Sequence, residues 1–423
     1  MIGNPLFASQ RGDFVRSIAR TAGMKPLDRY IALTGDSRTA NSFGGTAPSI
    51  TGENYGHGAH YCSQSGGRVR TDKGRCNATP GHTTKDWLDN MATYIANGGD
   101  AFMNLISVND RLASNNFSLT RSKRNVETGL RMQLDAGKIS CAIAELPTFG
   151  DYALSGQQLI NHLAMREWYL THVPDMGVIV VDPWPLMTAA DYVEGLHPAQ
   201  PGALKIAKCG AAPLIELFGV PLSLPTYDEP YDATNSKAGW LTANPLMLGT
   251  SGTKSGTGTI VGEVATGWNV AGSSFAGGTA RCFKEANPDG GEYQCFELGG
   301  TPTSAGSTLA LEQVIPLASL ATGNILRGLG KTVYFGLSGV GGVSLDLRFV
   351  RSGTAYFVKS LDRYNEGWQM SPGPETVPQE TPYLTANVST DTEIKLRCVI
   401  YGCQGVPIRG IVKVGNFAGG KVL

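Results

Sequence analysis

The sequence predicts two folded parts, an α/β domain built on a parallel sheet and an all-β sandwich that follows it. In the first half, short apolar runs alternate with segments of helical periodicity, which is typical of parallel strands joined by helices. In the second half, short alternating stretches lie between frequent turn residues, and residues 223–423 hold 31 of the 55 glycines. This pattern is typical of an antiparallel sandwich, and we expect a jelly-roll-like arrangement.

Each element of the α/β domain is marked by its residue pattern. The apolar runs that predict buried strands are 30–33, 101–108, 139–146 and 178–181. The segments with apolar residues at helical spacing are 83–96, 117–134, 155–170 and 201–218. Because strands and helices alternate along the chain, we expect one sheet with helices on both faces.

The chain divides into three parts by composition. Residues 1–28 alternate basic and apolar side chains and predict an N-terminal arm that docks on its own domain or on a partner. Residues 29–222 form the predicted α/β domain, and a proline-rich boundary follows it. Residues 223–423 form the predicted sandwich. Its strand-like stretches are 259–264, 332–337, 343–350, 355–358, 393–401 and 411–414.

Charge and hydropathy exclude several classes of function. Lys and Arg together number 35, and Asp and Glu together number 35. The chain therefore lacks the excess of basic residues that is typical of proteins that bind nucleic acid. The mean hydropathy is −0.10, and no apolar run is long enough to span a membrane. The N-terminal residues lack a basic region followed by an apolar one, so we expect no signal peptide in the chain as given. We nevertheless expect the protein to be extracellular or associated with a virion.

Three pairs of cysteines are close in sequence and are candidate disulfides, with buried reduced thiols as the alternative. The pairs are Cys62 with Cys76, Cys282 with Cys295, and Cys398 with Cys403. The second pair brackets an Asn-Pro-Asp-Gly-Gly turn at 287–291, and a hairpin there could place the two sulfurs opposite each other. No C-x-x-C motif or other ligand cluster indicates a metal site.

Two short motifs carry side chains that can act in acyl transfer. Ser37, in a Gly-Asp-Ser motif, directly follows an apolar strand, so it lies at the sheet edge where α/β sites form. Glu194 precedes His197 by three residues before the last helix, and a carboxylate there can hold the imidazole in one tautomer. Asp191 is an alternative orienting carboxylate. Taken alone, Ser37 also fits a helix N-cap, and His197 fits a surface residue in a proline-rich turn.

Two further residues can donate hydrogen bonds to a developing oxyanion. Asn109 follows the strand that begins near 101, and its side-chain amide is a donor. Gly81 lies at the start of a predicted helix, where a backbone N–H is a second donor. A helix cap is the alternative explanation for Asn109.

The four motifs, in this order, resemble the sequence blocks of the SGNH (GDSL-like) hydrolase family. Gly-Asp-Ser at 35–37 is intact, and residues 77–84 resemble the glycine block. Residues 107–110 resemble the Gly-x-Asn-Asp block, with Ser107 where the family usually has glycine. Residues 194–197 resemble the Asp-x-x-His block, with Glu194 in place of aspartate. The resemblance spans residues 29–215 and implies an SGNH-like α/β fold.

By this resemblance, the protein is a serine esterase that needs no metal or cofactor. Ser37, His197 and Glu194 would be the catalytic residues, and the Ser37 and Gly81 N–H groups with the Asn109 amide would form the oxyanion hole. Segment 42–76 is an insertion rich in Gly, Ser and Thr with few large aliphatic residues. It favours a small acyl group, such as acetyl, on a hydrophilic carrier such as a polysaccharide.

The second domain fits a role in glycan binding if aromatic side chains on it are exposed. The candidates for stacking on sugar rings are Trp240, Trp268 and Trp368. The whole arrangement resembles esterase-bearing tail or capsid appendage proteins of bacteriophages, which implies virion partners and a possible homotrimer. A secreted carbohydrate esterase is one alternative. Another is a non-enzymatic virion decoration or attachment module that binds surface glycans and keeps a relic esterase fold.

Overall fold

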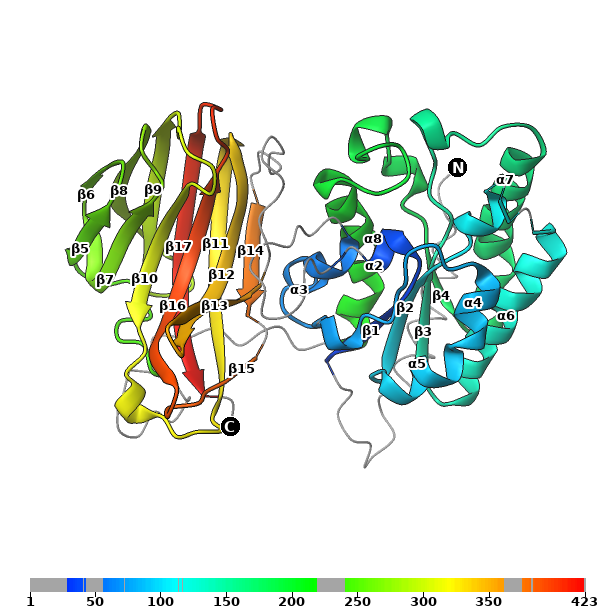
Figure 1. The fold of residues 1–423 in the computed structure, drawn as a ribbon, viewed down its shortest axis with the longest axis horizontal. Helices are drawn as coiled ribbons and strands as arrows, with labels where there is room; N and C mark the ends of the chain where they lie inside the picture. The colour runs from blue at the N-terminus through cyan, green and yellow to red at the C-terminus, as the bar shows by residue number, and fades with distance from the viewer. Residues whose placement is uncertain are drawn as a thin grey trace. The chain divides into compact units, whose positions relative to one another are not determined.

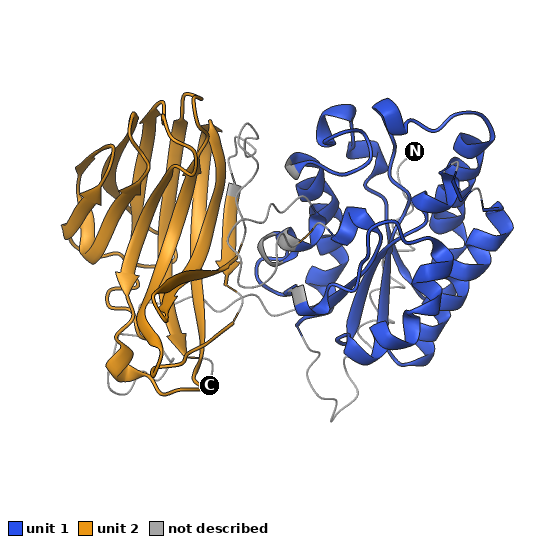
Figure 2. Cartoon of the chain, viewed as in Figure 1, with its two compact units in different colours: residues 1–40, 56–221 blue, residues 41–55, 222–423 orange. Residues whose placement is uncertain are grey.

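The computed structural model divides the chain into two compact units. The described residues are 29–40, 42, 56–71, 73–112, 114–115, 117–218, 240–360, 375–381 and 383–421. One unit comprises residues 1–40 and 56–221, and the other comprises residues 41–55 and 222–423 (Figure 2). The division after residue 221 lies beside the expected boundary at 222. The expected arm, residues 1–28, lies outside the described residues.

The first unit is built on a parallel sheet of four strands. β1 (Ile31–Gly35), β2 (Ala101–Leu105), β3 (Ile139–Ile143) and β4 (Ile179–Val181) lie in this order. Each strand is paired in parallel with the next. β1 and β2 are buried along their whole length, as expected for strands covered on both faces. The predicted α/β class is confirmed.

Helices cover both faces of this sheet (Figure 1). They are α2 (Ser37–Ala40), α3 (Tyr61–Gln64), α4 (Thr84–Asp89), α5 (Met91–Asn97), α6 (Leu119–Asp135), α7 (Gly156–Thr171) and α8 (Gln200–Phe218). Trp87 of α4, Val126 of α6 and Phe102 of β2 pack in one apolar core. The single helix predicted at 83–96 is two helices, because Asn90 ends α4 and begins α5.

Two predicted strands are too long at their carboxyl ends. β2 ends at Leu105, and a 3₁₀ turn (Val108–Arg111) follows Ser107. Ser107 has a φ of +119°, which no extended strand can accommodate. β3 likewise ends at Ile143. The residues after each strand are thereby free to turn across the edge of the sheet.

The second unit is a sandwich of two sheets. The order is β13-β12-β16-β10-β7-β5 in the six-stranded sheet and β14-β11-β17-β9-β8-β6 in the seven-stranded sheet, in which β15 also pairs with β11. The strands are β5 (Ser251–Gly256), β6 (Thr259–Gly262), β7 (Val264–Ser273), β8 (Gly278–Ala286), β9 (Glu292–Gly300), β10 (Thr308–Val314), β11 (Ile325–Ser338), β12 (Val340–Arg351), β13 (Thr354–Lys359), β14 (Glu375–Glu380), β15 (Leu384–Thr385), β16 (Asp391–Gly402) and β17 (Arg409–Lys421).

Alternation along the strands builds the core of the sandwich. In β16, Ile394, Leu396 and Cys398 are buried in the core, whereas Lys395 and Arg397 alternate with them and pair with carboxylates. The period of two is visible in the sequence. The predicted all-β second part is confirmed.

The tryptophans expected to stack on sugars are not exposed. Trp240 is 4% exposed and Trp268 is 1% exposed. Trp268 faces the core and stacks on Phe417, with ring centroids 5.0 Å apart. Burial of so much apolar area stabilises the fold, and it leaves no ring face for a ligand. The prediction for these two residues is wrong, and Trp368 lies outside the described residues.

The predicted Cys282–Cys295 disulfide is also wrong. The hairpin is present, with β8 and β9 joined through residues 287–291, but Cys282 pairs in register with Phe296 and Cys295 pairs with Phe283. A register offset of one residue puts the two cysteines on opposite faces of the sheet. Both are buried free thiols, and burial raises the pKa of each.

Of the two other predicted disulfides, one is contradicted by the structure and one is not tested by it. Cys398 is a buried free thiol within β16, and Cys403 lies beyond the end of that strand. Five residues of extended chain span roughly 16 Å, far beyond the ~7 Å limit of a disulfide. The Cys398–Cys403 prediction is therefore wrong. The Cys62 side chain lies outside the described residues, so the Cys62–Cys76 bridge stays a prediction.

Cys282, Cys295 and Cys398 should react with iodoacetamide in the unfolded protein without any reductant. The reason is that the hairpin register and the extended strand keep each thiol away from its proposed partner. Peptide mass spectrometry measures the labelling, with a fully reduced sample as the control. Labelling that requires prior reduction would contradict the register described above.

Candidate active site

Ser37 lies just beyond the carboxyl end of β1, an edge strand of the parallel sheet. β1 ends at Gly35, and Ser37 is the first residue of α2. Gly35 has a φ of +150°, and a Cβ at this position would lie 2.1 Å from the carbonyl oxygen of Leu105. Only glycine allows β1 and β2 to approach so closely before the chain turns into the serine. The side chain of Ser37 is largely buried.

His197 contacts Ser37 across 160 residues of sequence. Its Nε2 atom lies 2.7 Å from the Ser37 Oγ atom. His197 stands on the loop that precedes α8, so two distant parts of the chain meet at one sheet edge. The sequence placed both residues near this edge, and the structure brings them into hydrogen-bonding distance.

Glu194, and not Asp191, contacts the other side of the imidazole. The carboxylate of Glu194 accepts from His197 Nδ1. With the Nδ1 proton held there, Nε2 is left to accept a proton from the serine. Asp191 accepts instead from Lys205 Nζ at 2.8 Å and from the Thr188 N–H at 2.7 Å. Asp191 thus fixes the loop to α8 and does not reach the ring.

Backbone contacts hold the loop that carries Glu194 and His197. Gly195, between them, has a φ of +99°, and a Cβ there would lie 2.0 Å from the Phe149 carbonyl oxygen. The Phe149 N–H donates to the Gly195 carbonyl at 2.9 Å, and the Val193 N–H donates to the His197 carbonyl at 2.9 Å. A side chain at position 195 would push this loop away from the sheet.

Asn109 and the segment of Gly81 lie beside each other. The Asn109 amide donates to the His82 carbonyl at 2.9 Å. An amide carries two protons, so one remains for a ligand. Gly81 has a φ of +79° and open space where a Cβ would be. The Thr79 N–H donates to the Gly35 carbonyl at 3.1 Å, which ties this segment to the end of β1.

The backbone N–H groups of Ser37 and Gly81 are also available. Ser37 begins α2, and the first N–H groups of a helix have no partner within it. In the described part of the chain, neither N–H donates a hydrogen bond to another backbone group. The Ser37 and Gly81 N–H groups thus have no backbone acceptor among the described residues, and both lie on segments joined to β1.

A buried ion-pair network supports this edge of the sheet. Arg38 is 1% exposed and donates to Asp36 through Nε at 3.0 Å and through Nη2 at 2.7 Å. Its Nη1 reaches Glu145, beyond β3, at 3.4 Å. Burial by itself lowers the pKa of Arg38, but Asp36 and Glu145 outweigh it and raise the pKa above its ordinary value.

The same network reaches the strained Ser107. The Ser107 hydroxyl donates to Glu145, so one carboxylate joins the residues that follow β1, β2 and β3. A non-glycine residue at this φ costs about 1–3 kcal/mol, and such strain persists only where the surroundings impose it. The hydroxyl of Ser107 therefore has a structural use, because it fills a buried hydrogen-bonding position.

Sequence reasoning missed Arg38 and Glu145. The available signal was the presence of charged residues inside otherwise apolar surroundings directly after strands. Arg38 follows Ser37, and Glu145 interrupts the run 139–146. Charged residues are almost never fully buried unless they are paired, so two such residues beyond the ends of strands in one parallel sheet indicate a pair.

Neither a metal site nor a membrane span is found in the described part of the chain. The described residues contain no group of three or more His, Cys, Asp or Glu side chains that could hold a metal ion. Among the helices of the described ranges, none has the length and apolar character needed to cross a bilayer.

Comparison with known proteins gave structural similarity for about half of the chain. No family model and no curated protein matches the sequence. An aryl esterase from M. smegmatis matches with a TM-score of 0.37 and 12% identity, over 45% of this chain and 99% of its own. A GDSL-like lipase from Bacteroides thetaiotaomicron matches with a TM-score of 0.36 and 12% identity, over 49% and 98%.

A further solved structure has a similar extent of match. A carbohydrate acetylesterase from Sinorhizobium meliloti matches with a TM-score of 0.35 and 12% identity, over 45% of this chain and 100% of its own. The three structures named here are thus a GDSL-like lipase, an aryl esterase and a carbohydrate acetylesterase.

Replacing Arg38 with alanine should destabilise the first unit by about 3–5 kcal/mol, because it leaves two carboxylates buried without their cation. Urea unfolding measures the change. Arg131→Ala is the matched control, since Arg131 pairs with Glu127 on an exposed face of α6 and should cost only about 0.3–0.5 kcal/mol. Equal small losses for both variants would contradict the role given to Arg38.

Proposed function

We propose that this protein is a serine esterase with Ser37 as nucleophile, His197 as general base and Glu194 as the group that orients the histidine. The observation that carries the proposal is the unbroken chain of contacts from Glu194 through His197 to the Ser37 hydroxyl. A hydroxyl, an imidazole and a carboxylate in this sequence of contacts are the parts needed for acyl transfer, on whatever fold they occur.

The reaction would proceed in two halves. His197 Nε2 takes the Ser37 proton while Oγ attacks the ester carbonyl carbon. The tetrahedral intermediate then expels the alcohol, which receives that proton from His197. Water attacks the acyl-serine with His197 again as the base, and the acid leaves as Ser37 Oγ recovers its proton. Glu194 accepts from Nδ1 throughout and stabilises the imidazolium.

The oxyanion would be bound by the Ser37 and Gly81 N–H groups and the free Asn109 amide proton. Preorganised donors act most strongly where they are fixed before the reaction begins, and removing one typically costs about 3–4 kcal/mol of barrier. The His82 contact of Asn109 and the Gly35 contact of the Gly81 segment support such fixing.

Glutamate is one methylene longer than aspartate, and the loop accommodates the longer side chain. Glu194 and His197 are separated by Gly195 and Leu196, and the left-handed Gly195 turns the chain so that the carboxylate meets Nδ1. The Glu194 side chain is 35% exposed, whereas the Asp191 side chain is nearly fully buried and is paired with Lys205. These environments support Glu194 as the orienting group.

For the substrate, we propose a small acyl ester on a hydrophilic carrier, such as an O-acetylated polysaccharide. The support is compositional, because segment 42–76, which follows Ser37 in the sequence, is polar and contains only Ile50 and Val69 as large aliphatic residues. A lipid-binding cleft would need a broader apolar wall. An acyl-chain-length series would test this, with acetyl esters preferred over long-chain esters.

Ser37→Ala should lower kcat for p-nitrophenyl acetate by about 10⁴-fold or more, because the nucleophile is lost while the fold is kept. Ser155→Ala, an exposed serine whose side chain makes no cap hydrogen bond, is the control and should retain full activity. A fluorophosphonate probe should label the unsubstituted protein at Ser37. Absence of both labelling and turnover in the unsubstituted protein would favour a non-enzymatic attachment module. Unchanged turnover in Ser37→Ala would end the assignment of Ser37 as the nucleophile.

Glu194→Gln and Asp191→Asn should separate orientation from loop anchoring. Glu194→Gln should reduce kcat by about 10³–10⁴-fold with little change in unfolding temperature, since the amide favours the wrong histidine tautomer. Asp191→Asn should mainly lower the unfolding temperature, because it weakens the Lys205 contact. The reverse pattern, with activity lost only in Asp191→Asn, would assign the orienting role to Asp191.

A further inference from the structure

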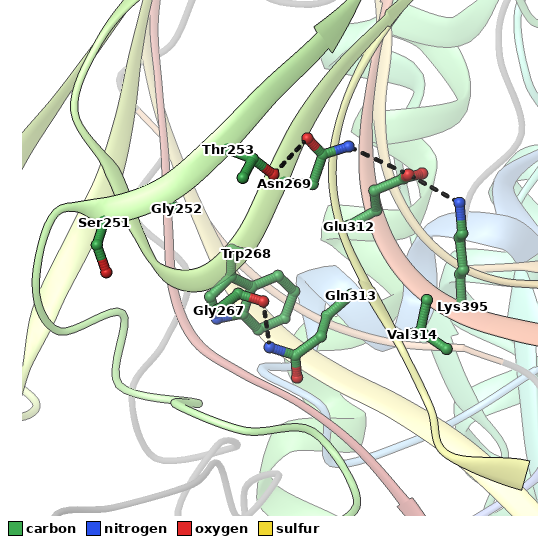
Figure 3. A pocket seen from close by; sticks show the side chains of 10 residues that line it. All are labelled: Ser251, Gly252, Thr253, Gly267, Trp268, Asn269, Glu312, Gln313, Val314 and Lys395. Atoms are coloured by element: carbon green, nitrogen blue, oxygen red, sulfur yellow. Dashed lines mark hydrogen bonds and ion pairs between the residues drawn. The ribbon is translucent and has the colours of Figure 1, made fainter.

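A cavity of about 440 Å³ lies in the second unit, on four neighbouring strands of the six-stranded sheet (Figure 3). Side chains and backbone of β5, β7, β10 and β16 line it. Its size falls within the roughly 300–1,000 Å³ typical of small-molecule sites. All of its lining residues belong to the second unit, so it is separate from the site of Ser37.

Polar side chains in the cavity are connected to one another. Lys395 Nζ donates to Glu312 at 3.0 Å, and the Asn269 amide donates to the same carboxylate oxygen at 3.4 Å. The Thr253 hydroxyl donates to the Asn269 carbonyl oxygen at 2.9 Å. These bonds hold the side chains in defined positions before any ligand arrives (Figure 3), which lowers the entropic cost of binding.

Several hydrogen-bonding groups in this cavity are left over. Gln313 donates through Nε2 to the Gly267 carbonyl at 2.8 Å, and its Oε1 atom is buried with no partner among the described residues. The Gln313 amide nitrogen carries a second proton that this bond does not use. The Glu312 carboxylate has further lone pairs, and the Lys395 ammonium has further protons.

The charges in the cavity cancel. Glu312 and Lys395 form an ion pair, with side chains only 12% and 21% exposed, and Asn269 and Gln313 are neutral. A charged ligand would therefore meet no uncompensated opposite charge. A ligand rich in neutral hydroxyl groups fits better, because each hydroxyl both donates and accepts, and the cavity offers both kinds of partner.

From this combination, we infer that the cavity binds a neutral saccharide. Glu312, Asn269 and Gln313 would bind adjacent hydroxyl groups, and Lys395 would donate to a ring or hydroxyl oxygen. Val314 at the rim is 52% exposed and offers apolar contact to the C–H face of a sugar. Stacking on Trp268 is not part of this site, since its ring is buried in the core.

The inference does not rest on ester hydrolysis, and its test uses the full chain carrying Ser37→Ala so that turnover cannot alter the ligand. Calorimetric titration with neutral oligosaccharides of hexose, N-acetylhexosamine and 6-deoxyhexose should reveal binding by at least one. Glu312→Gln and Asn269→Leu should each weaken that binding about tenfold or more, since each removes hydrogen bonds to the ligand.

The matched control is Glu297→Gln, the same exchange in an exposed ion pair with Arg281 on the other sheet, which should leave binding unchanged. Methyl NMR of the Ser37→Ala protein detects ligand binding without altering the polar residues of the cavity. The variant Val314→Ala identifies which methyl signals belong to Val314. The Val314 methyl signals should shift on titration. Absence of binding across the panel, unshifted Val314 signals, or binding that survives both cavity substitutions would overturn the inference.

Discussion

The buried charge of Arg38 constrains how the ends of the parallel strands are arranged. A guanidinium in the interior costs several kcal/mol in lost hydration, and only closely placed carboxylates offset that cost. Asp36 comes from the end of β1 and Glu145 from beyond β3, and Glu145 also accepts from Ser107 beyond β2. Because Ser37 lies between Asp36 and Arg38 in sequence, its backbone is fixed wherever that ion pair is fixed.

The histidine reaches the serine from a separately supported loop. Asp191 ties that loop to Lys205 of α8, and Gly195 allows it to lie against the backbone of Phe149. Neither contact involves Ser37. The 2.7 Å contact between His197 and Ser37 is therefore where two rigid supports meet. Displacement of reacting groups by about 1 Å can cost a factor of 10² in rate, so the precision of both supports matters.

In the sandwich, the alternation of strand residues separates stability from recognition. Inward positions such as Trp268 and Leu396 form the apolar core. Outward positions on the same strands carry Asn269 and Lys395, which line the cavity on the six-stranded sheet. An aromatic residue on a strand can serve either purpose, and its position relative to the period of two decides which.

The sequence alone determined the fold class, the alternation of the four parallel strands with the long helices, and the candidate residues at the sheet edge. It did so because burial on both faces produces continuous apolar runs, because helical and strand periods differ, and because parallel strands end at a common edge. Ser37, Asn109 and His197 could be named from those rules. The choice between Glu194 and Asp191 stayed open at that level.

Only the tertiary structure decided matters of register and of long-range pairing. One residue of offset between β8 and β9 placed Cys282 and Cys295 on opposite faces, and no local pattern specifies that offset. The pairing of Arg38 with Glu145, 107 residues away, and the burial of Trp240 and Trp268 likewise depend on contacts between distant segments. Local sequence constrains local conformation, whereas these outcomes depend on which segments finally pack together.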